Sequence, residues 1–154
     1  MRLDAHDLTT GEVYSLITVR ELGGGAQGEA HLVEVEGSAG SPRVAKLLHA
    51  ADVNSPKAQQ LIHFVHHAKS THGNDWPLDL PGAPTSVFRT DGGQVGCLSA
   101  YMAGPTLAAM GTLAGLFSKG PQHRLRAAAS IAAQMAVMHR HRFVWADAAC
   151  QNTI

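Results

Sequence analysis

The chain has 154 residues, and its 12 Lys and Arg side chains balance its 12 Asp and Glu side chains. This balance excludes the basic excess that is typical of nucleic-acid-binding proteins, and the length allows one core, or one small lobe and part of a second. The two cysteines, Cys97 and Cys150, lie far apart and favour a reduced, cytoplasmic protein over a disulfide framework. The N-terminus has no apolar signal-peptide region, and no run reaches the ~18 apolar residues of a membrane span.

The first half of the chain predicts three short strands. Residues 1–12 are polar and predict a loose lead-in, whereas residues 14–22 are rich in β-branched side chains and predict a strand. Residues 29–36 alternate between polar and apolar side chains, and a third strand is expected at 43–48, after a turn cluster at 37–42. The short connections between these strands favour an antiparallel meander.

A helix is expected directly after the third strand. Ser55 has the side chain of an N-cap, and Pro56 suits the first helical position. Apolar residues then recur with helical spacing as far as Ala68, and Gly73 predicts the end of the helix.

The second half predicts a hairpin followed by helices. Residues 86–90 and 96–102 flank a turn at Asp91-Gly92-Gly93, which predicts two further strands. After the glycine and proline of the 103–105 connector, helices are expected at 106–118 and 122–141.

The expected fold class is therefore α+β. Residues 13–103 would form a five-stranded antiparallel sheet with one packed helix, and residues 104–154 would begin a helical region.

Three glycines stand at the turn between the first two predicted strands. Gly23, Gly25 and Gly28 follow the pattern Gly-x-Gly-x-x-Gly, and glycine lets backbone N–H groups approach phosphate oxygens closely. A dinucleotide-binding turn of this pattern would open into a helix, whereas the residues after Gly28 alternate like a strand. A phosphate-binding hairpin is favoured, and a merely structural glycine hairpin remains the alternative.

Lys46 lies within an apolar run at 44–48. An unpaired ammonium in such a run is costly, so it needs either an anionic partner or a route to solvent at a sheet edge. With the glycine turn upstream, the phosphates of a nucleoside triphosphate become the better partner.

An acid and an amide stand five residues apart after the last predicted helix. Asp147 could orient a hydroxyl nucleophile and accept its proton, and the side-chain oxygen of Asn152 suits a magnesium ion. The pattern alone is common, and an aspartate that caps a turn is the alternative interpretation.

In this order, the motifs resemble the front part of a eukaryotic-type Ser/Thr protein kinase domain as found in bacteria. Gly23–Gly28 resembles the glycine-rich loop, and Val44-Ala45-Lys46 resembles the third-strand motif that ends in the phosphate-binding lysine. Residues 98–104 resemble the hinge that meets adenine. The resemblance implies the following site residues: for the nucleotide Gly23, Gly25, Gly28, Ala45, Lys46, Ala100, Tyr101 and Met102, for catalysis Lys46 and Asp147, and for the metal Asn152.

The sequence departs from the kinase pattern at several positions. Trp145-Ala146 replaces the usual His-Arg before the aspartate, and Ala149 replaces a lysine. No glutamate follows Glu36, so the first long helix offers Lys46 only a glutamine, with Gln59 favoured over Gln60. The sequence given stops before the Asp-Phe-Gly segment that the resemblance leads us to expect.

The resemblance implies a kinase-like N-lobe with the first helices of a C-lobe. It would bind ATP with Mg²⁺, and a longer parent would transfer the γ-phosphoryl group to a Ser/Thr hydroxyl of a protein substrate; this chain alone would be inactive. The expected partners are thus a nucleotide and a protein, with no nucleic acid and no membrane segment. A pseudokinase-type nucleotide-binding adaptor and a small-molecule phosphotransferase remain the alternatives.

Overall fold

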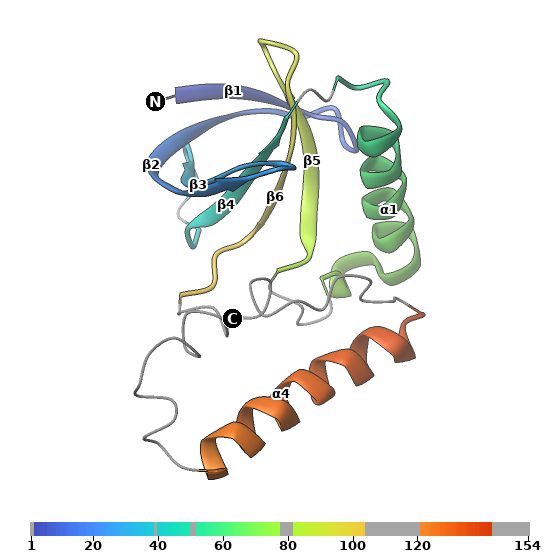
Figure 1. Ribbon diagram of the computed structural model, residues 1–154. Coiled ribbons are helices and arrows are strands. Elements are labelled where there is room, and N and C mark those ends of the chain that lie inside the picture. Colours follow the sequence, from blue (N-terminus) through green and yellow to red (C-terminus); the bar gives the residue numbers. More distant parts are fainter. Residues whose placement is uncertain (1, 39, 50–51, 78–81, 104–120, 143–154) are drawn as a thin grey trace. The chain divides into compact units, whose positions relative to one another are not determined.

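A computed structural model describes residues 2–38, 40–49, 52–77, 82–103 and 121–142 (Figure 1). The chain divides into two compact units, Met1–Tyr101 and Met102–Ile154, which are described separately below. The described elements, in chain order, are β1 (Arg2–Asp7), β2 (Val13–Gly25), β3 (Gly28–Val35), β4 (Arg43–Leu48), α1 (Pro56–His72), the 3₁₀ turn η1 (Gly73–Asp75), β5 (Pro84–Thr90), β6 (Val95–Ala100) and α4 (Pro121–Arg140).

The six strands of the first unit form a closed barrel in the order β1-β2-β3-β4-β6-β5. β1 closes it, because this strand pairs antiparallel with β2 on one side and with β5 on the other. The expectation of a five-stranded sheet preceded by a loose lead-in at residues 1–12 is therefore wrong. The composition of β1 is polar because alternate residues face solvent, while Leu3 and Ala5 still pack with the core.

The barrel interior forms one apolar core to which every strand contributes. Its buried members are Ala5, Leu16, Val33, Ala45, Leu47, Phe88 and Leu98. A second cluster forms where α1 packs on the outside of the barrel, beside β5 (Figure 1). It joins Ala58 and Val65 of the helix to strand residues such as Leu48 and Val87.

A buried polar network joins β1, β2 and β5. The Ser86 hydroxyl donates to Asp7 Oδ2 over 2.6 Å and lies 2.8 Å from the Tyr14 hydroxyl. Burial alone would raise the pKa of Asp7, but hydrogen bonds from Ser86, Thr9 and Thr10 outweigh it and hold the pKa below its ordinary value. Burial raises the pKa of Tyr14 to about 12, so this hydroxyl stays protonated at neutral pH.

Helix α1 begins and ends as its sequence predicts. The Ser55 hydroxyl accepts a hydrogen bond from the backbone N–H of Ala58 over 3.3 Å, and Pro56 is the first helical residue. At the other end, Gly73 has a positive φ of 57° and its N–H donates to the carbonyl of Lys69.

Most of the other predicted elements are confirmed. β4 has the predicted bounds, β5 and β6 form the predicted hairpin around residues 91–93, and α4 covers nearly all of the predicted 122–141 helix. The helix predicted at 106–118 lies outside the described residues.

Candidate functional site

The three predicted glycines lie at the hairpin between β2 and β3, where Gly25 pairs with Gly28 and Gly23 pairs with Ala30 (Figure 1). Gly23 has a φ of 141°, and a Cβ at Gly23 or Gly25 would meet no atom within 4 Å. A Cβ at Gly28, by contrast, would lie only 2.1 Å from the carbonyl oxygen of Leu47. Gly28 is therefore required by the close approach of the hairpin to β4, whereas Gly23 and Gly25 border open space.

The tip of this glycine hairpin is held at Gln27. Its carbonyl oxygen accepts hydrogen bonds from the backbone N–H of His49, at 3.2 Å, and from Lys57 Nζ, at 3.4 Å. His49 follows β4 directly and Lys57 lies in the first turn of α1. The hairpin is thus tied to both the strand and the helix beside it.

Lys46 lies on the outer face of the barrel, on the side of α1. It pairs with Ala30 of β3 and Cys97 of β6, and residues directly opposite each other share one face of a sheet. Leu48, two residues further along β4, packs with α1 and therefore shares this face as well.

A cavity of about 340 Å³ opens where the hairpin, β4, β6 and α1 meet. It is lined by Gln27, Lys46, Leu48, Lys57, Gln60, Leu61, Phe64 and Cys97. The cavity thus unites a residue of the glycine hairpin with Lys46, the pair of features on which the nucleotide hypothesis rests.

Among the residues that the structure describes, the lining of this cavity carries two ammonium groups and no carboxylate. Within the described part of the chain, neither Lys46 nor Lys57 takes part in an ion pair. Burial raises the pKa of Cys97 to about 11, against the opposing effect of the Lys46 ammonium, so the thiol adds no negative charge at neutral pH. The uncompensated positive charge suits an anionic ligand.

Gln60, rather than the favoured Gln59, lines the cavity with Lys46. The side chain of Gln59 instead donates a 2.7 Å hydrogen bond to the carbonyl of Val53. Helical spacing could have found this, because the cavity-lining residues of α1 stand at 57, 60, 61 and 64 and so share one face.

Ala45 is not placed to contact a ligand beside Lys46. It is 1% exposed, packs in the barrel core and pairs with His31 and Leu98. Neighbouring residues of a strand point to opposite faces, so Val44 shares the face of Lys46 while Ala45 faces inward. Val44 and Ala30 are the small apolar residues on the face of Lys46, and a period of two along each strand would have indicated them.

The remaining predicted site residues are not among the described lining residues of this cavity, and two of them lie outside the described residues. Ala100 ends β6 opposite Arg43, and the Tyr101 hydroxyl accepts a 3.1 Å hydrogen bond from Arg20. Met102 begins the second unit. Asp147 and Asn152 lie outside the described residues. The described side chains include no group of three or more His, Cys, Asp or Glu that could hold a metal.

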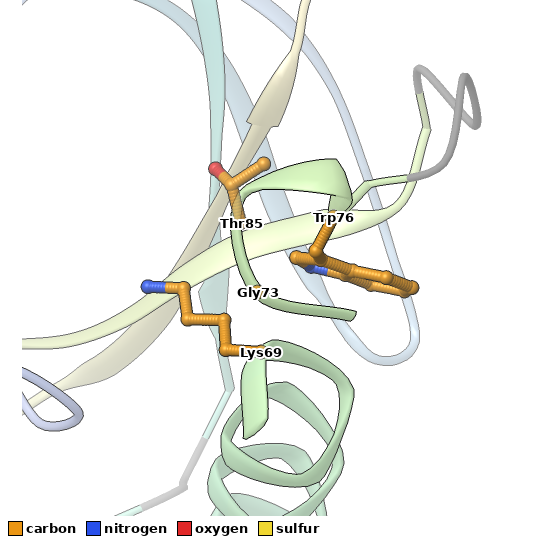
Figure 2. Close-up of a pocket in the computed structure, with 4 residues that line it drawn as sticks. All are labelled: Lys69, Gly73, Trp76 and Thr85. Carbon is orange, nitrogen blue, oxygen red and sulfur yellow. The ribbon is translucent and has the colours of Figure 1, made fainter. Parts of the chain in front are cut away.

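A second cavity, of about 440 Å³, lies beside the other end of α1 (Figure 2). It is lined by Lys69, Gly73, Trp76 and Thr85, and none of these residues was a predicted site residue. The Trp76 indole N–H donates to the carbonyl of Pro84 over 3.0 Å, which fixes one wall of this cavity.

The described fold is similar to that of protein kinases, although the six strands form a closed barrel. One solved structure with this fold is the crystal structure of the Mycobacterium tuberculosis PknI kinase domain, which matches with a TM-score of 0.60 and 19% sequence identity. The match covers 89% of this chain and 53% of the solved chain, so the protein spans about half the length of that kinase domain. At this identity the likeness shows the fold alone.

No protein-family model matches the chain, and no curated protein matches it. Among the described helices, none is both long and apolar enough to cross a membrane.

Proposed function

We propose that the protein binds a nucleoside triphosphate, with ATP as the expected nucleotide, against the cavity that contains Lys46. The observation that carries this proposal is the shared cavity of Gln27 and Lys46. It joins a glycine hairpin to an ammonium that has no carboxylate partner among the described residues. A triphosphate would supply the missing negative charge, and the exposed glycines would let backbone N–H groups approach its oxygens.

The nucleotide would contact the face of the barrel that carries Lys46. Ala30 and Val44 share that face and offer small apolar surfaces to a base. Gly23, Gly25 and Gly28 keep their proposed role beside the phosphates. For Ala100, Tyr101 and Met102 we retain the role implied by the kinase resemblance, in which backbone groups meet the base.

In a longer chain, this nucleotide-binding unit would serve a protein kinase. A Ser or Thr hydroxyl oxygen would attack the γ-phosphorus of ATP, ADP would leave, and Asp147 would accept the hydroxyl proton. Lys46 would stabilise the charge on the phosphates during transfer. The proposed role of Asn152 toward Mg²⁺ rests on the sequence resemblance, and magnesium would neutralise phosphate charge when bound.

A nucleotide-binding module without phosphotransfer is the second candidate, and the lining of the cavity favours it. Protein kinases hold the strand lysine with a helix glutamate, whereas α1 presents Gln60 and contains no acidic residue. A neutral amide leaves the ammonium free for an anion but positions it less firmly. Both candidates predict nucleotide binding, and they differ in whether phosphate is transferred.

Two measurements on the same preparation test the proposal and separate its two forms. We expect MgATP to raise the melting temperature of the protein, and the Lys46→Met variant to lose this shift. The matched control, Lys69→Met, removes an ammonium at the other end of α1 and should keep it. Transfer of labelled phosphate from ATP to a Ser/Thr-containing protein would support the kinase. Binding of ATP without transfer would support the nucleotide-binding module. A wild-type melting temperature that MgATP does not change would overturn both.

A further inference from the structure

Lys57 occupies an unusual place for a cation. It is the second residue of α1, whose first turn carries no acidic side chain. The N-terminus of a helix bears a partial positive charge, so an ammonium there is unfavourable unless an anion compensates for it. Among the described residues, Lys57 Nζ donates a hydrogen bond to the carbonyl oxygen of Gln27, which is neutral and 3.4 Å away.

Lys57 and Lys46 line the same cavity from different elements. Lys46 comes from β4 and Lys57 from α1, while Gln27 brings the glycine hairpin to the same space. Two ammonium groups, one of them from the first turn of α1, therefore line one cavity whose described lining has no carboxylate. An anion with several charges, spread over several oxygens, would satisfy both lysines at once.

We propose that Lys57 is a second phosphate-binding residue, which contacts the polyphosphate group of the nucleotide together with Lys46. This inference rests on the nucleotide-binding function proposed above. Because Lys57 also contacts the hairpin tip, a bound polyphosphate links α1, β4 and the glycine hairpin. The link replaces the helix carboxylate that Lys46 lacks: the ligand itself, rather than an ion pair within the protein, couples the helix to the strand.

Lys57 should then matter more for a triphosphate than for a monophosphate. Removing its ammonium takes one charge-assisted hydrogen bond away from a long phosphate chain, and we expect ATP binding to weaken by about tenfold. AMP reaches fewer of the charged groups, so its affinity should change far less. Affinity for inorganic tripolyphosphate, which has no base, should fall in parallel with that for ATP.

The experiment compares calorimetric affinities of ATP, AMP and tripolyphosphate for wild type, Lys57→Gln, Lys57→Arg and Lys69→Gln. Lys57→Gln should weaken ATP and tripolyphosphate binding about tenfold. Lys57→Arg should restore most of the affinity, because it keeps the charge, and Lys69→Gln should bind like wild type. Amide hydrogen exchange supplies a second readout, with residues 56–61 protected by ATP in wild type but not in Lys57→Gln.

The outcomes separate this inference from the proposed function. If wild type binds ATP and Lys46→Met abolishes it while Lys57→Gln changes nothing, the role of Lys57 is overturned and the nucleotide function stands. Equal decreases in AMP and ATP affinity for Lys57→Gln would also overturn it, because they indicate a structural role. If wild type binds tripolyphosphate through both lysines but not ATP, the anion site stands and the nucleotide function fails.

Discussion

Ser86 and Asp7 lie 79 residues apart in the sequence, and the Ser86 hydroxyl donates a 2.6 Å hydrogen bond to Asp7 Oδ2. This bond ties the first strand to β5 at the seam where the barrel closes. Asp7 also accepts hydrogen bonds from Thr9 and Thr10, so one carboxylate organises both the end of β1 and the turn that follows it.

Removing this carboxylate should destabilise the barrel. Asp7→Ala leaves several buried or half-buried donors without their acceptor, and we expect the free energy of unfolding to fall by about 3 kcal/mol. Ser86→Ala removes one hydroxyl and should cost about 1 kcal/mol. Urea unfolding monitored by tryptophan fluorescence measures the free energy of unfolding of both variants. An Asp7→Ala variant as stable as wild type would show that β1 does not hold the barrel closed.

The Tyr14 hydroxyl in the same network predicts an alkaline decrease in stability. Its pKa is raised to about 12 in the folded protein, whereas the pKa of an unfolded tyrosine is about 10. Between these values the unfolded state loses the proton first, so stability falls as pH rises from about 10 to about 12. Below that window the contribution of Tyr14 to stability is complete and does not change with pH.

The Tyr14→Phe variant isolates this effect from the lysines that titrate in the same range. The difference in unfolding free energy between wild type and Tyr14→Phe should be constant below pH ~10 and shrink above it. A difference that stays constant through the alkaline range would contradict the raised pKa.

We expect two glycine-to-alanine substitutions in the hairpin to differ in their effect on stability. Gly28→Ala would place a Cβ 2.1 Å from the Leu47 carbonyl oxygen, so we expect the free energy of unfolding to fall by about 2 kcal/mol or more. Gly25→Ala meets no atom within 4 Å and should stay within about 0.5 kcal/mol of wild type. Thermal melting checks both, and equal melting temperatures for the two variants would show that the hairpin does not lie against β4.

Adding a carboxylate to the cavity should weaken anion binding. Gln60→Glu places a negative charge among Lys46 and Lys57, and we expect its affinity for tripolyphosphate to fall about fivefold. Gln59→Glu adds the same charge to the neighbouring helix position, whose side chain bonds Val53 outside the cavity lining. Similar decreases in both variants would indicate a general charge effect and not a defined cavity.

Local signals allowed most of the fold to be predicted from the sequence. Ser55 and Pro56 mark the start of α1 through capping chemistry that depends on neighbouring residues alone. β1 was missed because its stability comes from partners far along the chain, including Thr90 of β5, and its outward residues give it a polar composition. Barrel closure is therefore a property of tertiary pairing that composition does not report.

The sequence predicted a nucleotide site at the glycine hairpin and Lys46, and this site remains a prediction. In the structure Gln27 of the hairpin and Lys46 line one cavity. Ala45 was assigned to the ligand because it neighbours Lys46 in the motif, although adjacent strand residues face opposite sides. The proposed role of Lys57 could not be predicted from the sequence, because its contact with Gln27 depends on how α1 packs beside the hairpin.

The Lys46 ammonium is proposed to lie beside the phosphates of a bound nucleotide, and every functional prediction depends on this position. An acyl-phosphate derivative of ATP, which transfers its acyl group to a nearby lysine amine, tests this most directly when the modified residues are mapped by mass spectrometry. We expect acylation of Lys46 that excess ATP suppresses, with Lys69 unmodified. Acylation of Lys46 that ATP does not suppress, or suppressible labelling at Lys69 in its place, would contradict the proposed nucleotide site.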